Sequence, residues 1–231
     1  MTRSTGAAAP GEQQGSSAGD VKASDVTAER CLAVVGIGAS AGGLNAIQRL
    51  FQHMPRSTGM AFILVPHLDP RNPSLMVDLI ARQTGIPVGE AQDGMAVTAD
   101  RIYVIPPNRY LAVEDGVLRL LTPPRTAGRQ TPIDAFLRTL ADAYQERAVG
   151  IILSGTGAHG TLGLRAIKGR DGLAMVQDPA SAEYDQMPRS AIAAGLADYV
   201  LEPEAMPEAL VEYLAQRIGH KPPWDEILPK G

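Results

Sequence analysis

The 231-residue chain contains a single cysteine, Cys31, so it cannot form an internal disulfide framework. Its four histidines do not combine with cysteine in any zinc-ligand spacing, and it has no H-E-x-x-H motif, so we expect no metal. The net charge of −4 excludes the strongly basic field that nucleic acid or anionic lipid requires. No apolar run reaches membrane-spanning length. These absences favour a cytoplasmic protein without a cofactor, a nucleic-acid partner or a membrane insertion.

The two ends of the chain differ in composition from its middle. Residues 1–29 contain almost no large apolar side chains, so they cannot bury enough surface to offset the entropy cost of ordering. We therefore predict a disordered N-terminal tail there, and a loose C-terminal tail at residues 219–231, which contain three prolines. One ordered domain is expected over residues 30–218, and the hydrophobic fraction of 45% is sufficient for its core.

Short apolar runs alternate with helical patterns through this domain. After a first strand that begins near Cys31, strands are predicted at 61–65, 148–153, 173–177 and 198–201, with helices between them and a last helix at 204–218. Thr131 followed by Pro132 is a typical helix start. Residues 101–105, 111–113 and 117–121 resemble short strands around an Asp-Gly hairpin turn. The fold class predicted is α/β, doubly wound around a mainly parallel sheet with helices on both faces and a small antiparallel excursion at one edge.

A glycine-rich turn follows the first predicted strand. Residues 38–42 (GASAG) fit the G-x-S-x-G elbow, in which a sharp turn exposes the hydroxyl of Ser40. The same letters approximate a dinucleotide-binding fingerprint, with a pyrophosphate facing the start of a helix. Any strand-to-helix turn in a parallel sheet also favours glycine. The turn alone leaves a nucleophile, a nucleotide loop and a purely structural turn as alternatives.

Two further strand-to-helix turns place histidines at the same sheet edge. His67 lies just past the second predicted strand, and a second glycine-rich turn at 154–160 contains His159. Ligands bind at the carboxyl edge of open α/β sheets, so these side chains and Ser40 are expected to face one region. Because a serine needs a neighbouring base to become a nucleophile, the coincidence of Ser40 with His67 favours the catalytic interpretation.

Five short motifs together resemble the catalytic domain of CheB chemotaxis methylesterases, and most closely the version found in CheB–CheR fusion proteins. They occur in the family's order and span most of the expected domain. The motifs are IGASAGG (37–43), PHLDP (66–70), IPPNR (105–109), LSGTGAHG (153–160) and QDP with MPRSA (177–191).

The resemblance implies hydrolysis of glutamate γ-methyl esters on chemoreceptors or related sensors, and glutamine deamidation as a second family activity. It assigns Ser40 as the nucleophile and His67 as the general base, with backbone N–H groups of Ala41 and Thr156 as oxyanion donors. It also implies two protein partners, a methylated receptor and a CheR-type methyltransferase. In this mechanism Ser40 attacks the ester, His67 transfers the proton to methanol, and water resolves the acyl-enzyme.

The chain departs from the family at the third catalytic position, where His159 replaces an aspartate. A neutral imidazole can accept the same hydrogen bond but brings no negative charge, and in other triad enzymes loss of the acid costs roughly 10⁴-fold in kcat. Three alternatives therefore stay open. The protein is a slow esterase through His159, an esterase that uses another acid such as Asp69 or Asp178, or an inactive relative that binds receptor helices.

Overall fold

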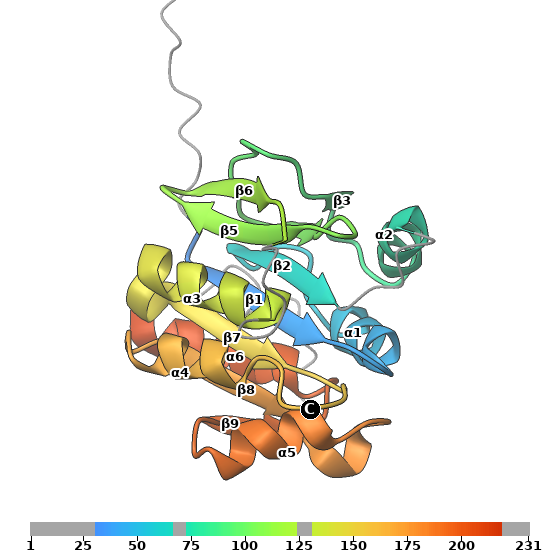
Figure 1. The fold of residues 1–231 in the computed structure, drawn as a ribbon, viewed down its shortest axis with the longest axis vertical. Coiled ribbons are helices and arrows are strands. Elements are labelled where there is room, and N and C mark those ends of the chain that lie inside the picture. Colours follow the sequence, from blue (N-terminus) through green and yellow to red (C-terminus); the bar gives the residue numbers. More distant parts are fainter. Residues whose placement is uncertain (1–30, 67–72, 124–130, 219–231) are drawn as a thin grey trace, which may run out of the picture.

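The structure is a computed structural model, and it describes residues 31–66, 73–123 and 131–218. Both predicted tails and the predicted base His67 lie outside the described residues, as does Asp69. The described chain forms one parallel sheet between two layers of helices, with a short hairpin above one layer (Figure 1). No helix within the described ranges is long and apolar enough to cross a bilayer.

The main sheet contains seven strands, and every neighbouring pair is parallel. In spatial order they are β3 (Val88–Glu90), β4 (Arg101–Val104), β2 (Met60–Pro66), β1 (Ala33–Ala39), β7 (Ala148–Ile152), β8 (Leu173–Gln177) and β9 (Tyr199–Leu201). The chain starts in the middle, builds outward to β3, and returns to the other side of β1. Strands β1 and β7 therefore lie at the switch point of the topology, where ligands bind in open α/β sheets.

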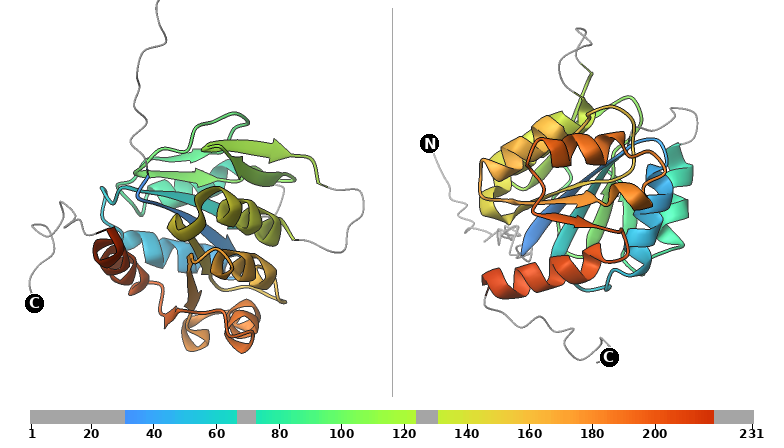
Figure 2. Two further views of the ribbon diagram at one scale, coloured as in Figure 1. Left: turned by 90° about the vertical axis from the view of Figure 1, so that its left-hand side faces the viewer. Right: turned by 90° about the horizontal axis from the view of Figure 1, so that it is seen from below.

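Helices cover both faces of the sheet, as predicted (Figure 2). One face carries α3 (Pro132–Tyr144), α4 (Thr161–Lys168) and α5 (Gln186–Ala193), and the other carries α1 (Gly43–Gln52), α2 (Pro73–Ala81) and α6 (Met206–Ile218). Two short 3₁₀ turns, η1 (Gln145–Arg147) and η2 (Pro179–Ser181), complete the connections. All seven residues of β1 are buried, as expected for a central strand covered on both faces.

The hairpin is the antiparallel part of the fold. Strands β5 (Tyr110–Glu114) and β6 (Val117–Leu121) form a separate two-stranded sheet that packs against α3. Asp115 and Gly116 both have positive φ, 50° and 76°, as the predicted Asp-Gly turn requires. Residues 101–104, which the sequence grouped with this excursion, instead form β4 of the parallel sheet. The antiparallel excursion is thus confirmed over 110–121 only.

Glycine in β1 makes room for the side chains of α3 against the central strand. A Cβ atom at Gly36 would lie 2.7 Å from Leu137 Cδ2 and 2.8 Å from Leu140 Cδ2. The helix begins as predicted, with Thr131 Oγ1 accepting a hydrogen bond from Asp134 N at 3.1 Å. The close packing brings the start of α3 to the carboxyl edge of β1 and β2.

Candidate functional site

Ser40 occupies a sharp turn directly after β1. Its backbone N–H donates to Ser154 O at 2.9 Å, and its carbonyl accepts from Gly43 N at 2.9 Å. Gly42, the N-cap of α1, has a φ of 71°, a conformation that favours glycine. Ser40 is partly exposed, whereas the whole of β1 before it is buried. Ser40 therefore lies, as the G-x-S-x-G pattern predicts, in a sharp turn between a strand and a helix with its side chain accessible.

The turn after β7 lies beside this elbow. Leu153 N donates to Gly38 O at 2.9 Å, which continues the pairing of β7 with β1. A Cβ atom built at Gly155 would lie 2.9 Å from Ser40 Cβ, so the serine side chain stands directly against this glycine. Strand pairing therefore fixes the distance between the two glycine-rich turns.

Ser154 connects three segments of the site. Its side chain is buried, and its hydroxyl donates to Ala41 O at 2.8 Å and accepts from Tyr184 N at 3.0 Å. Its own N–H donates to Gln177 Oε1 at 2.8 Å, while Gln177 Nε2 donates to Ser181 O at 3.1 Å. These bonds hold the loop between η2 and α5 against the serine elbow.

Two backbone N–H groups next to Ser40 remain available for a ligand. In the turn after β7, Gly155 N donates to Tyr184 O at 2.9 Å and Gly157 N donates to Gln186 Oε1 at 2.8 Å. Among the described residues, Thr156 N between them has no hydrogen-bond partner, and neither has Ala41 N. Ala41 directly follows Ser40, and Thr156 directly follows Gly155, which packs against Ser40, so the two N–H groups that the family resemblance implies as oxyanion donors belong to adjacent turns.

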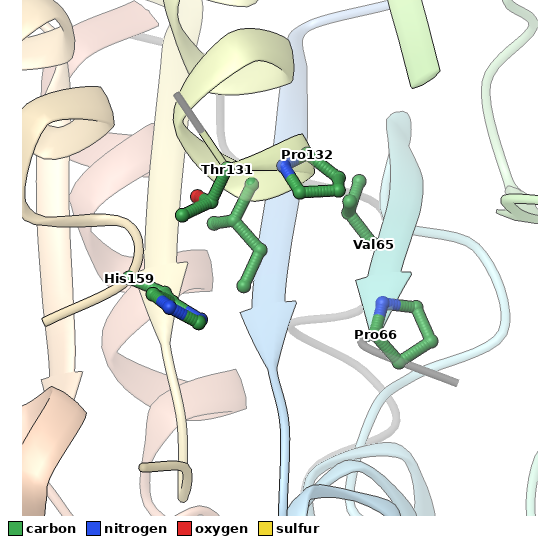
Figure 3. A pocket seen from close by; sticks show the side chains of 6 residues that line it. Val65, Pro66, Thr131, Pro132 and His159 are labelled. Carbon is green, nitrogen blue, oxygen red and sulfur yellow. The ribbon is translucent and has the colours of Figure 1, made fainter. Parts of the chain in front are cut away.

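His159 lies on the far side of the same turn, just before Gly160, the N-cap of α4. Its half-buried ring faces a pocket of about 70 Å³, space for roughly two water molecules (Figure 3). The other lining residues come from the end of β2 and the start of α3: Val65, Pro66, Thr131, Pro132 and Ile133. Pro66 directly precedes His67, so His159 borders the point from which the predicted base leaves β2.

Two carboxylates near this edge already accept hydrogen bonds from backbone N–H groups. Asp178, one acid that the sequence offered as a substitute, accepts from Ala180 N at 3.0 Å and closes the turn η2. Asp134 is buried, and it accepts from Thr131 Oγ1 at 2.6 Å and from Gly163 N at 2.9 Å. It therefore ties the first turn of α3 to α4.

The structure brings four of the five predicted site residues to one edge: Ser40, Ala41, Thr156 and His159. The fifth, His67, is outside the described residues. Sequence reasoning missed the residues that support this edge. Ser154 and Gln177 belong to the motifs LSGTGAHG and QDP, but no role was predicted for them. The signal that points to their supporting role is a polar side chain at the buried end of a strand.

Cys31 is remote from this chemistry. It is buried as predicted, its Sγ donates weakly to Val97 O at 3.8 Å, and burial raises the pKa of its thiol. A raised pKa keeps the thiol protonated and unreactive at neutral pH. Within the described ranges, no three His, Cys, Asp or Glu side chains come together in a way that could hold a metal ion.

Comparison with known proteins gives a consistent result. Residues 35–210 match the family model described as CheB methylesterase. A Leptospira interrogans protein named "Putative protein-glutamate methylesterase/protein-glutamine glutaminase" is 34% identical over 176 residues, which are 76% of this chain and 91% of that protein. An Anaeromyxobacter dehalogenans protein-glutamate methylesterase/protein-glutamine glutaminase is 34% identical over 183 residues, 78% of this chain and 54% of the relative.

A solved structure supports the same assignment at the level of the fold. The crystal structure of the Thermotoga maritima CheB methylesterase catalytic domain superimposes with a TM-score of 0.72 at 26% identity. The match covers 78% of this chain and 98% of that domain. The parallel sheet and the helical layers described above therefore form an architecture shared with that catalytic domain.

Proposed function

The chain belongs to the CheB methylesterase family, and from that premise we propose that it hydrolyses γ-methyl esters of glutamate on chemoreceptor or sensor proteins. The relatives' names combine this activity with glutaminase activity, so deamidation of receptor glutamines is part of the proposal. The observation that carries it is that Ser40 packs against Gly155, while the N–H groups of Ala41 and Thr156 have no hydrogen-bond partner among the described residues.

The reaction is an acyl transfer to Ser40. The hydroxyl oxygen attacks the ester carbonyl, and His67 takes the hydroxyl proton and passes it to the departing methoxy group, which leaves as methanol. The negative charge on the carbonyl oxygen is stabilised by the N–H groups of Ala41 and Thr156. A water molecule, activated by His67, then hydrolyses the acyl-enzyme and yields free glutamate and the serine.

His159 occupies the position that orients the base in the proposed triad. An imidazole can accept the hydrogen bond that a triad carboxylate accepts, but it does not supply the negative charge that stabilises the imidazolium. By the cost of losing the triad acid in other enzymes, about 10⁴-fold in kcat, the barrier rises by about 5 kcal/mol. We infer that the protein turns over slowly, unless an acid outside the described residues, such as Asp69, replaces the missing charge.

The histidine at position 159, in place of the family's aspartate, also favours a second candidate function. In this alternative the chain binds methylated receptor helices without turnover and regulates access to them. Both functions require binding of the methylated receptor, and they differ only in whether methanol is released. For either function we propose a location in the cytoplasm, where receptor helices and a CheR-type methyltransferase would be the partners.

The decisive experiment measures methanol release from methylated receptor by the wild type, Ser40→Ala and His159→Asp side by side. We expect slow release by the wild type, none by Ser40→Ala, and faster release by His159→Asp. Receptor binding with no methanol from the wild type or from His159→Asp would favour the binding module. An unchanged rate in His159→Asp alone would mean that the site uses a different acid.

Labelling with a serine-directed fluorophosphonate tests the nucleophile independently of the receptor. We expect Ser40 to be labelled and Ser40→Ala to remove the label. Ser190→Ala is the matched control, because Ser190 Oγ lies near the same edge, 3.4 Å from Gly157 O, but belongs to α5. Loss of labelling in the Ser190 variant, or no labelling at all, would contradict the assignment of Ser40.

A further inference from the structure

A free carboxylate stands next to the serine elbow. Glu183, in the loop between η2 and α5, packs on Gly42: a Cβ atom built at Gly42 would lie 2.8 Å from Glu183 Cβ and 3.0 Å from its Oε2. The side chain is exposed, and among the described residues it forms no ion pair and no hydrogen bond. Its negative charge is therefore not neutralised by a partner within this part of the protein.

The backbone beside this carboxylate is fixed. Tyr184, the next residue, donates its N–H to Ser154 Oγ at 3.0 Å and accepts from Gly155 N at 2.9 Å. On the other side of Glu183, the carbonyl of Ser181 accepts from Gln177 Nε2 at 3.1 Å. Tyr184 is thus bonded to the turn after β7, which packs against Ser40, and Ser181 is bonded to β8, so the backbone at Glu183 is held beside the serine turn.

We propose that Glu183 is a specificity-determining residue that makes the site favour the neutral glutamyl ester over the anionic glutamate. The inference rests on the proposed function, in which the side chain that enters the site is uncharged before hydrolysis and a carboxylate afterwards. Glu183 does not change the binding of the neutral ester, but its negative charge repels the glutamate product. It thereby discriminates between methylated and unmethylated receptor side chains and speeds the release of product.

The size of the effect follows from Coulomb's law. Gly42 is two residues from Ser40, so their Cα atoms are at most roughly 7 Å apart, and we take about 7 Å as the separation between Glu183 and a carboxylate held at Ser40. With an effective dielectric constant between about 40 and 80, the repulsion weakens binding of the glutamate form by about 3- to 7-fold. Both charges are near solvent, so salt at 0.5 M is expected to remove most of the effect.

Glu183 also lies at the amino end of α1, where a negative charge favours the helix. A purely structural role of this kind would change the stability of the protein. It would not change the relative affinity for two peptides that differ only in one methyl group. The ratio of the two affinities therefore separates the roles.

The test uses the full chain with Ser40→Ala, which prevents turnover. Calorimetry measures the dissociation constants of two synthetic helical peptides, one with a single γ-methyl glutamate and the other with glutamate at that place. We expect the added substitution Glu183→Gln to tighten binding of the glutamate peptide by about 3- to 7-fold relative to the ester peptide at low salt. The control is Glu212→Gln, because Glu212 is an exposed acid on α6, and this change should leave the ratio as it was.

The outcomes distinguish this inference from the proposed function. An unchanged ratio in the Glu183 variant, with both peptides binding measurably, overturns the inference alone. The same is true if Glu212→Gln shifts the ratio equally, since the effect would then come from net charge. Failure of both peptides to bind, together with no methanol release by the wild type, overturns the inference and the proposed function together.

Discussion

Replacing Ser154 by alanine would separate the elbow from the loop that covers it. The substitution removes only an oxygen atom, from a side chain that is 1% exposed. It deletes the 2.8 Å bond to Ala41 O and the 3.0 Å bond from Tyr184 N. Each such bond contributes about 1 kcal/mol net, and a buried group left without a partner costs more, so we expect the free energy of unfolding to fall by about 2–3 kcal/mol.

Urea denaturation followed by circular dichroism measures this change. An unchanged dependence of the unfolding free energy on urea would show that Ser154→Ala unfolds in the same way as the wild type. Thr161→Val is the matched comparison. Thr161 Oγ1 is buried and has no hydrogen-bond partner among the described residues, so the same loss of a hydroxyl should be neutral or stabilising there. A loss below about 0.5 kcal/mol in Ser154→Ala would refute the bridging role of the hydroxyl. Equal losses in both variants would refute it as well.

Three further predictions concern packing, a buried acid and pH. Gly36→Ala should lower the free energy of unfolding by about 1–3 kcal/mol, because the added methyl group would meet α3 side chains at 2.7–2.9 Å. Gly89→Ala in β3 should be tolerated, because the nearest atom to its added methyl group is 3.6 Å away. Thermal melts compare the two variants. Asp134→Ala should cost about 2–4 kcal/mol in urea, since Gly163 N would lose its buried acceptor, and a cost under 1 kcal/mol would contradict this. Burial raises the pKa of Tyr144 to about 12. The unfolded chain therefore loses this proton at lower pH than the folded protein, and the free energy of unfolding should fall between about pH 10 and 12. Tyr144→Phe should reduce that fall, and identical pH profiles of the two proteins would contradict the prediction.

Much of the fold follows from local patterns. The start of α3 was predictable because Thr131 and Pro132 are a cap and a first-turn residue, and the structure places the helix start there. Strand β3 was not predicted, since three partly exposed residues around Gly89 give no periodic signal. Helix α5 begins at Gln186. Pro188 is tolerated in its first turn because the N–H groups there have no partner within the helix.

The position of the candidate site could be predicted from the sequence, but the contacts that hold it in place could not. The serine turn and the His159 turn were expected at one edge because parallel strands end together. The role of Ser154 depends on contacts with Ala41 and Tyr184, which are distant in the sequence and which no local pattern encodes. Glu183 is similar, since only the packing of its loop on Gly42 reveals that the charge lies beside the elbow.

The strand order also has a consequence for how the protein is made. Val34 in β1 pairs with Ala148 in β7, so the two turns that flank the candidate site leave the ribosome far apart in time. Pairings between such distant segments form slowly, because the intervening chain must first be closed into a loop. The serine turn is synthesised early, but its neighbour Gly155 arrives only after the hairpin and α3. A nascent chain that stops before β7 would therefore carry Ser40 without the turn that packs against it, and the candidate site would be complete only when β7 has joined the sheet.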